Sequence, residues 1–259
     1  MSTTTVRTSP GVAIAQHIGT RTEQCDAAAI RTNKATGVRA LVLLDGIGDT
    51  PTVRDWTRDA AQRLAIVAAR VGDAETALRA EYERYAAPQR GSGIEEDPPG
   101  AAAIVAVTRP GQPITIAWAG DCRAYAITRS EARQLTADHN LRRVWPPCAT
   151  HNGGNRHRIT SHLGDCLTDD EVKALHNHPA IEATTYTPSA PGTRLLLATD
   201  GAYEPHEATT YPLTLLAEGP MRIAAANGVQ DAVATAEAAT EPDIHADNAT
   251  ILLARVDPS

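Results

Sequence analysis

The chain has 259 residues, a formal net charge of −7 and no phenylalanine. A chain of this length can bury a sizeable core as one large domain or two small ones. Its Lys and Arg residues are scattered without a basic stripe, which argues against nucleic acid as a partner. The longest apolar run, at 40–44, is far too short to span a bilayer, and the N-terminus lacks a secretory signal pattern.

The four cysteines, Cys25, Cys122, Cys148 and Cys166, lack the close spacing of a disulfide framework. We therefore expect free thiols in a reduced, cytoplasmic protein without a membrane partner. Because aromatic residues make up only 3% of the chain, Ala, Val, Leu and Ile must fill the core.

Short β-rich runs open the chain, and a helical hairpin follows them. The runs at 11–18, 26–32 and 37–44 predict strands, and the last ends in an Asp-Gly turn. Apolar residues then recur at steps of three and four over 53–71, which predicts an amphipathic helix. Gly72 and Asp73 are expected to end this helix and cap a second one, which stops before Pro88.

The stretch at 88–99 is the most linker-like part of the chain, and strand patterns dominate after it. A mobile loop is expected at 140–160, a short helix at 167–176, and helical segments broken at 219–220 and 227–228. Further strands are expected at 101–108, 114–120, 123–128, 181–188, 194–199 and 249–256. Without internal repeats, the pattern predicts one α+β domain over residues 1–259.

Four aspartates, Asp45, Asp121, Asp200 and Asp247, lie where an apolar strand meets a turn. Rigid strand ends can present short carboxylates at a common rim, and carboxylates that converge repel one another unless cations neutralise them. This pattern is compatible with a shared Mg²⁺ or Mn²⁺ site. It is also compatible with four ordinary turns, because Asp-Gly is a common turn dipeptide.

Five blocks in order resemble a known family. Residues 45–48 (DGIG), 120–140 (GDCRAYAITRSEARQLTADHN), 159–165 (ITSHLGD), 195–204 (LLLATDGAYE) and 247–256 (DNATILLARV) resemble those of the bacterial PP2C-type metal-dependent Ser/Thr protein phosphatases. The resemblance runs from about residue 10 to residue 256. It implies a four-layer αββα sandwich of two antiparallel sheets flanked by helices, with a flap-like segment at about 140–160.

The resemblance also implies a ligand set for two metal ions, Mn²⁺ or Mg²⁺. Asp45 would bridge the two ions, and the Gly46 carbonyl would bind the second. Asp200 and Asp247 would complete the first site, while Asp121 together with Asp200 would bind a third, weaker ion.

Arg21 falls where the family has its phosphate-binding arginine, and Asp26 matches the aspartate that steadies metal-bound water. With Asp45 these form the expected catalytic set. A water activated by metal would attack phosphoserine or phosphothreonine directly. The resemblance thus implies phosphoprotein substrates, opposition to a Ser/Thr kinase, and a monomeric enzyme.

Cys25 departs from the family, whose motif has a metal-binding glutamate at this position. A thiol is a poor ligand for Mg²⁺ or Mn²⁺, so the second metal site should be weaker, unless Asp26, water or Glu23 fills the gap. An alternative is therefore a weakened or inactive PP2C-like protein that binds phosphoproteins or another partner. Glu204 stands where the family often has aspartate, preserving the charge with a longer reach.

Two other readings compete with the phosphatase. The cluster of Cys148, His151, His157, His162 and Cys166 suggests zinc, although its spacing fits no common zinc template and loop histidines are the simpler explanation. Cysteine nucleophile chemistry would require an activated thiol. The acidic residues around Cys25 oppose such activation, because they raise a thiol pKa.

Overall fold

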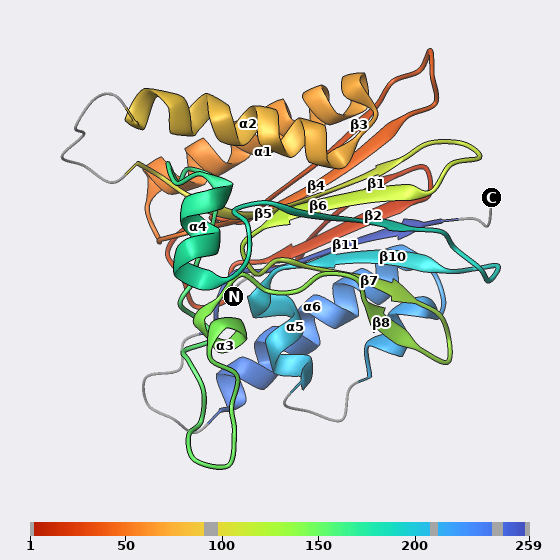
Figure 1. The fold of residues 1–259 in the computed structure, drawn as a ribbon. Coiled ribbons are helices and arrows are strands. Elements are labelled where there is room, and N and C mark those ends of the chain that lie inside the picture. Colours follow the sequence, from red (N-terminus) through yellow and green to blue (C-terminus); the bar gives the residue numbers. More distant parts are fainter. Residues whose placement is uncertain (1–2, 91–97, 208–211, 240–245, 257–259) are drawn as a thin grey trace.

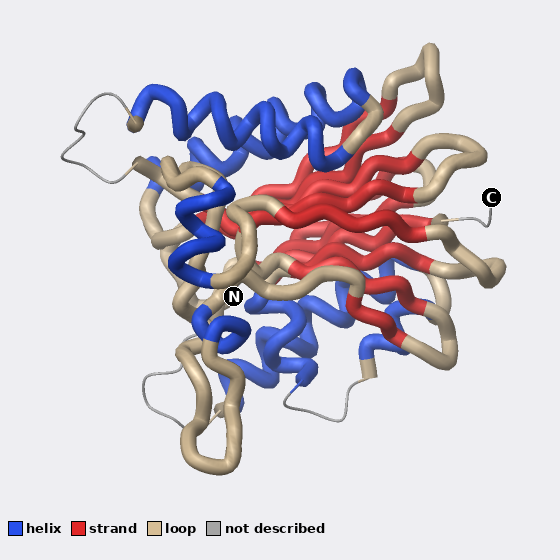
Figure 2. Tube along the Cα trace, in the orientation of Figure 1, coloured by secondary structure: helices blue, strands red, loops and turns tan. Residues whose placement is uncertain are grey.

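A computed structural model describes residues 3–90, 98–207, 212–239 and 246–256. They form two antiparallel β-sheets packed face to face between layers of helices (Figures 1 and 2). The αββα sandwich expected from the family resemblance is therefore confirmed. Most of the linker predicted at 88–99 lies outside the described residues.

One sheet has six strands in the order β1-β2-β11-β10-β7-β8, and every pairing in it is antiparallel. Its strands are β1 (Thr5–Ser9), β2 (Val12–His17), β7 (Arg123–Ile127), β8 (Ala132–Gln134), β10 (Arg194–Ala198) and β11 (Ala249–Arg255). The elements that cover its outer face are α5 (Asp200–Glu207), α6 (Met221–Ala238) and the 3₁₀ helix η1 (Leu213–Ala217).

The other sheet has five strands in the order β3-β4-β5-β6-β9, also antiparallel throughout. Its strands are β3 (Ala27–Thr32), β4 (Arg39–Gly46), β5 (Ala101–Thr108), β6 (Ile114–Ala119) and β9 (Glu182–Tyr186). The helices on its outer face are α1 (Pro51–Val71) and α2 (Ala74–Gln89), while α3 (Leu141–Val144) and α4 (Asp169–His176) lie at one end of the sandwich (Figure 1). Among the described residues, no helix combines the length and the apolar character needed to cross a membrane.

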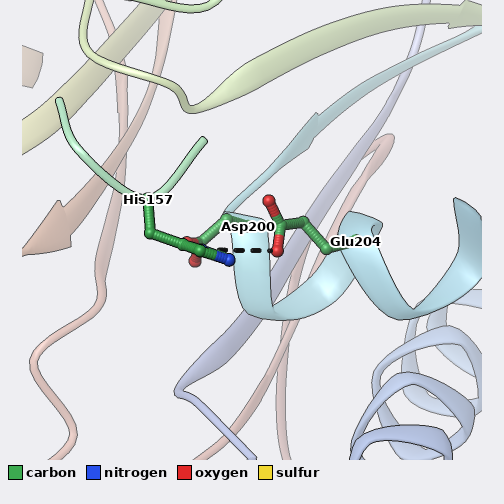
Figure 3. Close-up of side chains that lie close together, drawn as sticks. All are labelled: His157, Asp200 and Glu204. Atoms are coloured by element: carbon green, nitrogen blue, oxygen red, sulfur yellow. Dashed lines mark ion pairs between the residues drawn. The ribbon is translucent and has the colours of Figure 1, made fainter. Parts of the chain in front are cut away.

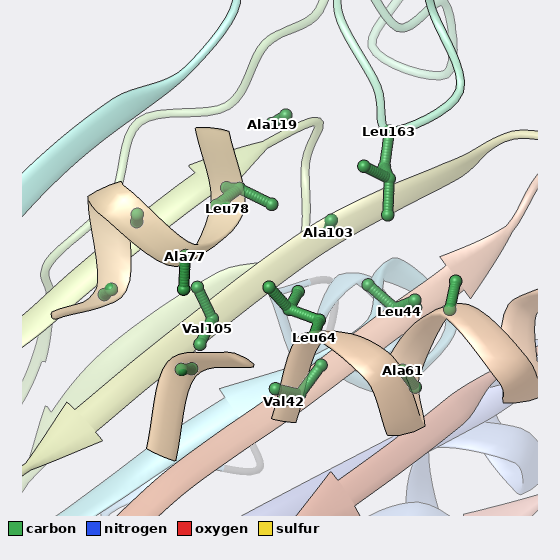
Figure 4. Close-up of a cluster of buried hydrophobic side chains, with 14 of the residues drawn as sticks. Val42, Leu44, Ala61, Leu64, Ala77, Leu78, Ala103, Val105, Ala119 and Leu163 are labelled. Carbon is green, nitrogen blue, oxygen red and sulfur yellow. The ribbon is translucent and has the colours of Figure 1, made fainter. Parts of the chain in front are cut away.

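The central strand β4 shows why its sequence is a continuous apolar run. Leu41 and Leu43 point between the two sheets, whereas Val42 and Leu44 point toward the helices. Both faces are buried, so period-two alternation with polar residues is absent. On the helix side, Leu64 of α1 and alanines of both helices pack against the sheet (Figure 4). Alanine side chains allow the close approach that a core without phenylalanine requires.

The helical hairpin has the predicted caps. Gly72 adopts a left-handed conformation at the end of α1, and the Asp73 side chain accepts a hydrogen bond from the Thr76 N–H at 2.9 Å. The prediction that the second helix stops before Pro88 is wrong, because α2 runs to Gln89. Proline in a final turn interrupts little of a helix, and the Gln89 side chain ties this turn to the Gly164 carbonyl at 3.0 Å.

The prediction of a helix break at 227–228 is also wrong, since α6 is continuous through these residues. A Cβ atom on Gly228 would lie 2.8 Å from Leu216 and 2.9 Å from Ile251. This glycine therefore serves close packing of the helix on its neighbours rather than a turn. The break predicted at 219–220 is confirmed, because α6 begins directly after Pro220. The structure also adds β1, an edge strand that the sequence patterns did not predict.

Gly120 joins β6 to Asp121 and has no room for a side chain. Its φ is +114°, and a Cβ atom would lie 2.5 Å from the Ala102 Cβ and 2.7 Å from its Cα. Glycine is therefore required at this end of β6, both for conformation and for space.

We predict that Gly120→Ala lowers the free energy of unfolding by about 3 kcal/mol, since it combines overpacking with backbone strain. Gly111→Ala is the matched control, because Gly111 also has a positive φ, +68°, but no atom lies within 4 Å of a Cβ built there. That variant should lose only about 1 kcal/mol. Urea denaturation measures both values, and equal losses would contradict the packing explanation.

Candidate metal and active site

The strand-end aspartates converge at one edge of the sandwich. Asp45 lies near the end of β4, Asp200 opens α5 directly after β10, and Asp247 precedes β11. Burial raises the pKa of Asp45 well above its usual range, and repulsion from Asp26, Asp200, Asp121 and Asp247 raises this pKa further. Each of these carboxylates is therefore close enough to Asp45 to raise its pKa. Four unrelated turns would not explain why the four strand ends lie together.

Asp200 responds to the same crowding. Burial raises its pKa, and the charge of Asp247 adds to the rise, whereas a hydrogen bond from the Asp45 side chain opposes it. A carboxylate cluster of this kind is stable only when protons or cations reduce its charge. The donor set is all oxygen, which suits Mg²⁺ or Mn²⁺.

Asp26 is the most deeply buried member of the cluster, with 2% of its surface exposed. Its Oδ2 accepts hydrogen bonds from the hydroxyl groups of Thr199 at 3.1 Å and Thr250 at 2.6 Å. Its Oδ1 is buried and has no hydrogen-bond partner within the described ranges. A buried carboxylate oxygen without a partner indicates a place for a bound water or cation. The oxygen donors of Asp45, Asp200 and Asp247, with this unpaired oxygen beside them, thus fit a hard divalent cation.

Arg21 enters the site through an ion pair. Its Nη2 lies 2.6 Å from Asp247 Oδ2, and about two-fifths of each side chain is exposed. The loop that carries Arg21 is held by Asn248, whose side chain bonds to Ile18, Glu23 and Cys25 of this loop. Sequence reasoning did not assign this positioning role to Asn248, although it quoted the Asp-Asn pair as part of a motif.

Cys25 is buried, with 1% of its surface exposed, and its Sγ lies 3.8 Å from the Thr50 carbonyl oxygen. Burial is the largest effect and raises the pKa of this thiol, the contact with the Thr50 carbonyl opposes it, and the carboxylates of Asp49, Asp26 and Glu23 raise the pKa further. The thiol is therefore protonated at neutral pH. A buried, protonated thiol is suited neither to nucleophilic attack nor to binding Mg²⁺.

The nearby carboxylates do not simply replace the missing glutamate. Glu23 pairs with Arg54 at 2.7 Å, on the side of the loop toward α1. Asp49 accepts hydrogen bonds from the backbone N–H groups of Thr22 and Glu23 at 3.0 and 2.7 Å. Among the described residues, Asp26 is the candidate to fill the gap that has a buried carboxylate oxygen without a partner.

Asp121 lies beneath the rim, with 4% of its surface exposed. Burial raises its pKa well above the usual range, and Asp200 is the first charge that adds to this effect. Its backbone carbonyl accepts a hydrogen bond from the Tyr203 hydroxyl at 3.0 Å, which fixes the turn against α5. The structure therefore brings Asp121 to the Asp200 side of the cluster.

A second group of side chains that could bind a metal ion includes Asp200. Ligand atoms of His157, Asp200 and Glu204 all lie within 4.8 Å of one another (Figure 3). Arg156 binds the same Glu204 with its Nε at 2.5 Å, and its Nη2 lies 3.0 Å from Glu207. Sequence reasoning noted His157 only as part of the zinc pattern. Cys148 and His151 of that pattern instead pair with each other in an exposed β-bridge.

These groups line a cavity of about 890 Å³. Its carboxylates include Asp45, Asp200 and Asp247, whereas Arg21 and Arg156 supply positive charge to its wall. Segment 140–160, expected to be a loop, contains α3 and contributes Arg156 to this cavity. A cavity lined by carboxylates and arginines together is suited to a metal-bound phosphate ester.

Comparisons with known proteins agree with this arrangement. Residues 55–143 match the family profile Protein phosphatase 2C. Three solved structures resemble the whole chain: a bacterial serine phosphatase, the S. agalactiae serine/threonine phosphatase and the Mycobacterium tuberculosis serine/threonine phosphatase PstP/Ppp. No curated protein matches the sequence.

The likeness covers nearly all of each chain. The bacterial serine phosphatase has a TM-score of 0.67 at 18% identity, over 96% of this chain and 98% of its own. The S. agalactiae and M. tuberculosis proteins have TM-scores of 0.67 and 0.63 at 16% and 18% identity, each over 99% of this chain and 100% of its own. The fold is that of the PP2C-type phosphatases. The family resemblance expected from the motifs is thus confirmed, while the residue roles inside the PP2C-like site stay proposals.

Two stacked histidines brace the Asp121 turn of this PP2C-like fold. The rings of His139 and His178 lie 4.2 Å apart, and both side chains are buried. His139 Nδ1 accepts from the Gly120 N–H, so its Nε2–H donates to Glu182. His178 Nδ1–H donates to the Pro179 carbonyl, so its Nε2 accepts from a threonine hydroxyl. The pair is therefore held neutral.

We predict that His178 destabilises the folded state as the pH drops below about 6.5, the usual histidine value, whereas the buried carboxylates, whose pKa is raised, act in the opposite direction. Burial lowers the pKa of His178 to about 4, so the unfolded chain binds a proton first and the folded state loses stability across this window. The free energy of unfolding should change less between pH 7 and pH 5 in His178→Asn than in the parent. The difference between the two changes should be about 1 kcal/mol after allowing for solvent screening. His151→Asn, at an exposed loop position, is the control. If the pH dependence of unfolding were unchanged in His178→Asn, the assignment of His178 as a buried, neutral histidine would be contradicted.

Proposed function

We propose that this chain is a metal-dependent phosphoprotein phosphatase that hydrolyses phosphoserine and phosphothreonine. The observation that carries the proposal is the convergence of Asp45, Asp200 and Asp247 on one cavity, beside a buried Asp26 whose Oδ1 has no partner among the described residues. The PP2C fold and the bacterial phosphatases that share it support the same reaction class. Mn²⁺ or Mg²⁺ are the cofactors that an all-oxygen set would hold.

The family resemblance implies the metal ligands, and the convergence of the carboxylates supports them. Asp45, Asp200 and Asp247 would hold one ion, Asp45 and the Gly46 carbonyl a second, and Asp121 with Asp200 a third, weaker one. A bound pair of such ions lowers the pKa of a water between them, so that hydroxide is available near neutral pH. Gly46 must stay glycine for this purpose, because a Cβ atom there would lie 2.7 Å from the Cys25 carbonyl oxygen.

The protein groups have distinct tasks in this reaction. Asp26 would orient the attacking water through its unpaired Oδ1, since its Oδ2 is fixed by two threonines. Arg21 would exchange part of its contact with Asp247 for the phosphate oxygens, where its planar fork stabilises the developing charge. Because Cys25 is buried and protonated, the attack does not proceed through this thiol.

A weakened or inactive protein that binds phosphoproteins is the second candidate, and Cys25 is the observation that favours it. Glu23 and Asp49 are already engaged by Arg54 and by backbone N–H groups. The second metal would therefore have one carboxylate ligand fewer than the family pattern, and the catalytic rate would fall accordingly.

The remaining parts of the proposal follow from the reaction. The substrates would be phosphoproteins made by an opposing Ser/Thr kinase, and the protein would act as a cytoplasmic monomer in a single domain.

We predict Mn²⁺-dependent hydrolysis of p-nitrophenyl phosphate and of a phosphothreonine peptide, abolished by a chelator. Asp200→Asn should lower the rate roughly a hundredfold or more, because it removes a direct metal ligand. Asp170→Asn, an exposed position on α4, is the matched control and should keep full activity. If the protein is folded but shows no turnover at millimolar Mn²⁺, the phosphatase proposal is wrong and an inactive phosphoprotein-binding protein is favoured.

We predict that Cys25→Glu restores the missing ligand, raising the turnover rate and lowering the Mn²⁺ concentration for half-maximal rate by roughly tenfold. Isothermal titration calorimetry with Mn²⁺ gives a readout that is independent of turnover. Cys148→Glu, which adds the same charge at an exposed thiol, should change neither quantity. If Cys25→Glu weakened both metal binding and rate, the assignment of this position would be wrong.

A further inference from the structure

Strand β3 is the edge strand of the five-stranded sheet (Figure 1). A groove outside the catalytic cavity runs along it. It consists of two cavities of about 700 and 280 Å³. Ile30 and Thr32 line both cavities, so the two are continuous along the strand. No residue of this groove lines the catalytic cavity.

The groove is basic in a protein whose net charge is −7. Arg7 lines one cavity and Arg31, Lys34 and Arg70 line the other, whereas no acidic residue lines either among the described residues. Burial lowers the pKa of Arg7, and the neighbouring Arg58 lowers it further, as expected where cations gather.

Three of these cations also lack a partner for their side chains. Within the part of the chain that the structure describes, the side chains of Arg31, Lys34 and Arg70 make no hydrogen bond or ion pair, whereas those of Arg79 and Arg123 pair with carboxylates. A cluster of unpaired like charges is unfavourable by itself and becomes favourable when an anionic partner binds.

The backbone of β3 offers hydrogen-bonding groups along the same groove. The carbonyls of Asp26 and Ala28 accept from the side chains of Gln16 and Arg7, which lie on the side away from β4. Even-numbered residues of β3 therefore direct their backbone groups outward, because strand geometry alternates. Among the described residues, the outward groups of Ile30 and Thr32 have no partner.

Apolar side chains complete the groove. Ile66 of α1 is 50% exposed, and Ile30 is partly buried at the junction of the two cavities. An exposed isoleucine beside a free strand edge is a feature that binding would cover.

We propose that this groove binds an acidic, extended segment of a partner protein, which adds a strand to β3. The outward backbone groups would pair with the main chain of the segment, the isoleucines would contact its apolar side chains, and the cations would bind its carboxylates. This combination favours a polypeptide over nucleic acid, which has no main chain that continues a β-sheet. The proposal does not depend on the proposed catalytic activity.

A simpler reading is that the cations only protect an exposed edge from pairing with other chains. That reading accounts for Arg31 and Lys34 beside the strand. It does not account for Ile66, an exposed apolar side chain on the opposite wall. Arg70 has a role of its own in the last turn of α1, where a cation is favoured, so the test must separate these explanations.

The test uses the full chain and a fluorescent synthetic peptide of repeated Val-Val-Asp-Asp units. Fluorescence anisotropy should show binding that weakens at high salt, whereas a repeated Val-Val-Lys-Lys peptide and oligothymidylate should not bind comparably. The triple variant Arg31→Glu, Lys34→Glu, Arg70→Glu should bind the acidic peptide about tenfold or more weakly. Arg222→Glu, at an exposed position on α6, is the matched control and should bind as the parent does.

A second variant tests strand addition separately from charge. Thr32→Pro removes an outward N–H but leaves every cation in place, and proline is tolerated on an edge strand. It should also weaken peptide binding, with thermal unfolding showing that the variant is folded. Equal peptide binding by parent and triple variant would overturn the proposal, as would equally tight binding of oligothymidylate. Unchanged binding by folded Thr32→Pro would overturn strand addition.

Discussion

Mutual repulsion among carboxylates at one edge of the sandwich is the constraint around which the rest of this molecule is arranged. Burial raises the pKa of Asp26, Asp45 and Asp200, and neighbouring carboxylates raise each of them further, so the cluster can be fully charged only beside cations. Arg21 neutralises part of this negative charge through its ion pair with Asp247, and Arg156 neutralises another part through its ion pair with Glu204. The remainder is what divalent cations would neutralise.

The two sheets make such crowding possible because each holds its strand ends rigidly. Asp45 ends a strand of one sheet, whereas Asp200 and Asp247 flank strands of the other, so the cavity lies where both sheets end. Asn248 then binds the loop that carries Arg21 and Cys25 with three hydrogen bonds. Cys25 is thus held in a position that the family gives to a carboxylate, and the proposed weakness of a second metal site would follow from the chemistry of the thiol rather than from a displaced loop.

Local signals predicted the elements well where the physical cause is local. Gly72 ends α1 through its own backbone conformation, and Asp73 caps α2 with its own side chain. Both predicted caps are confirmed. The predictions at Pro88 and Gly228 were wrong because a helix tolerates these residues only through partners far along the chain. The last turn of α2, which contains Pro88, is tied to Gly164, and Gly228 lets α6 pack closely on Leu216 and Ile251. Strand β1 was not predicted, since an exposed edge strand lacks an apolar pattern.

The sequence by itself determined one α+β domain with strand-end aspartates, because apolar runs and turns are properties of neighbouring residues, and its resemblance to a known family implied the αββα fold and the departure at Cys25. Only the tertiary structure decided that Glu23 and Asp49 are engaged elsewhere, that His157 reaches Glu204, and that Asn248 holds the Arg21 loop. It also gathered cations that look scattered along the chain into one groove beside β3. Such contacts join residues far apart in sequence, and packing alone sets which of them meet.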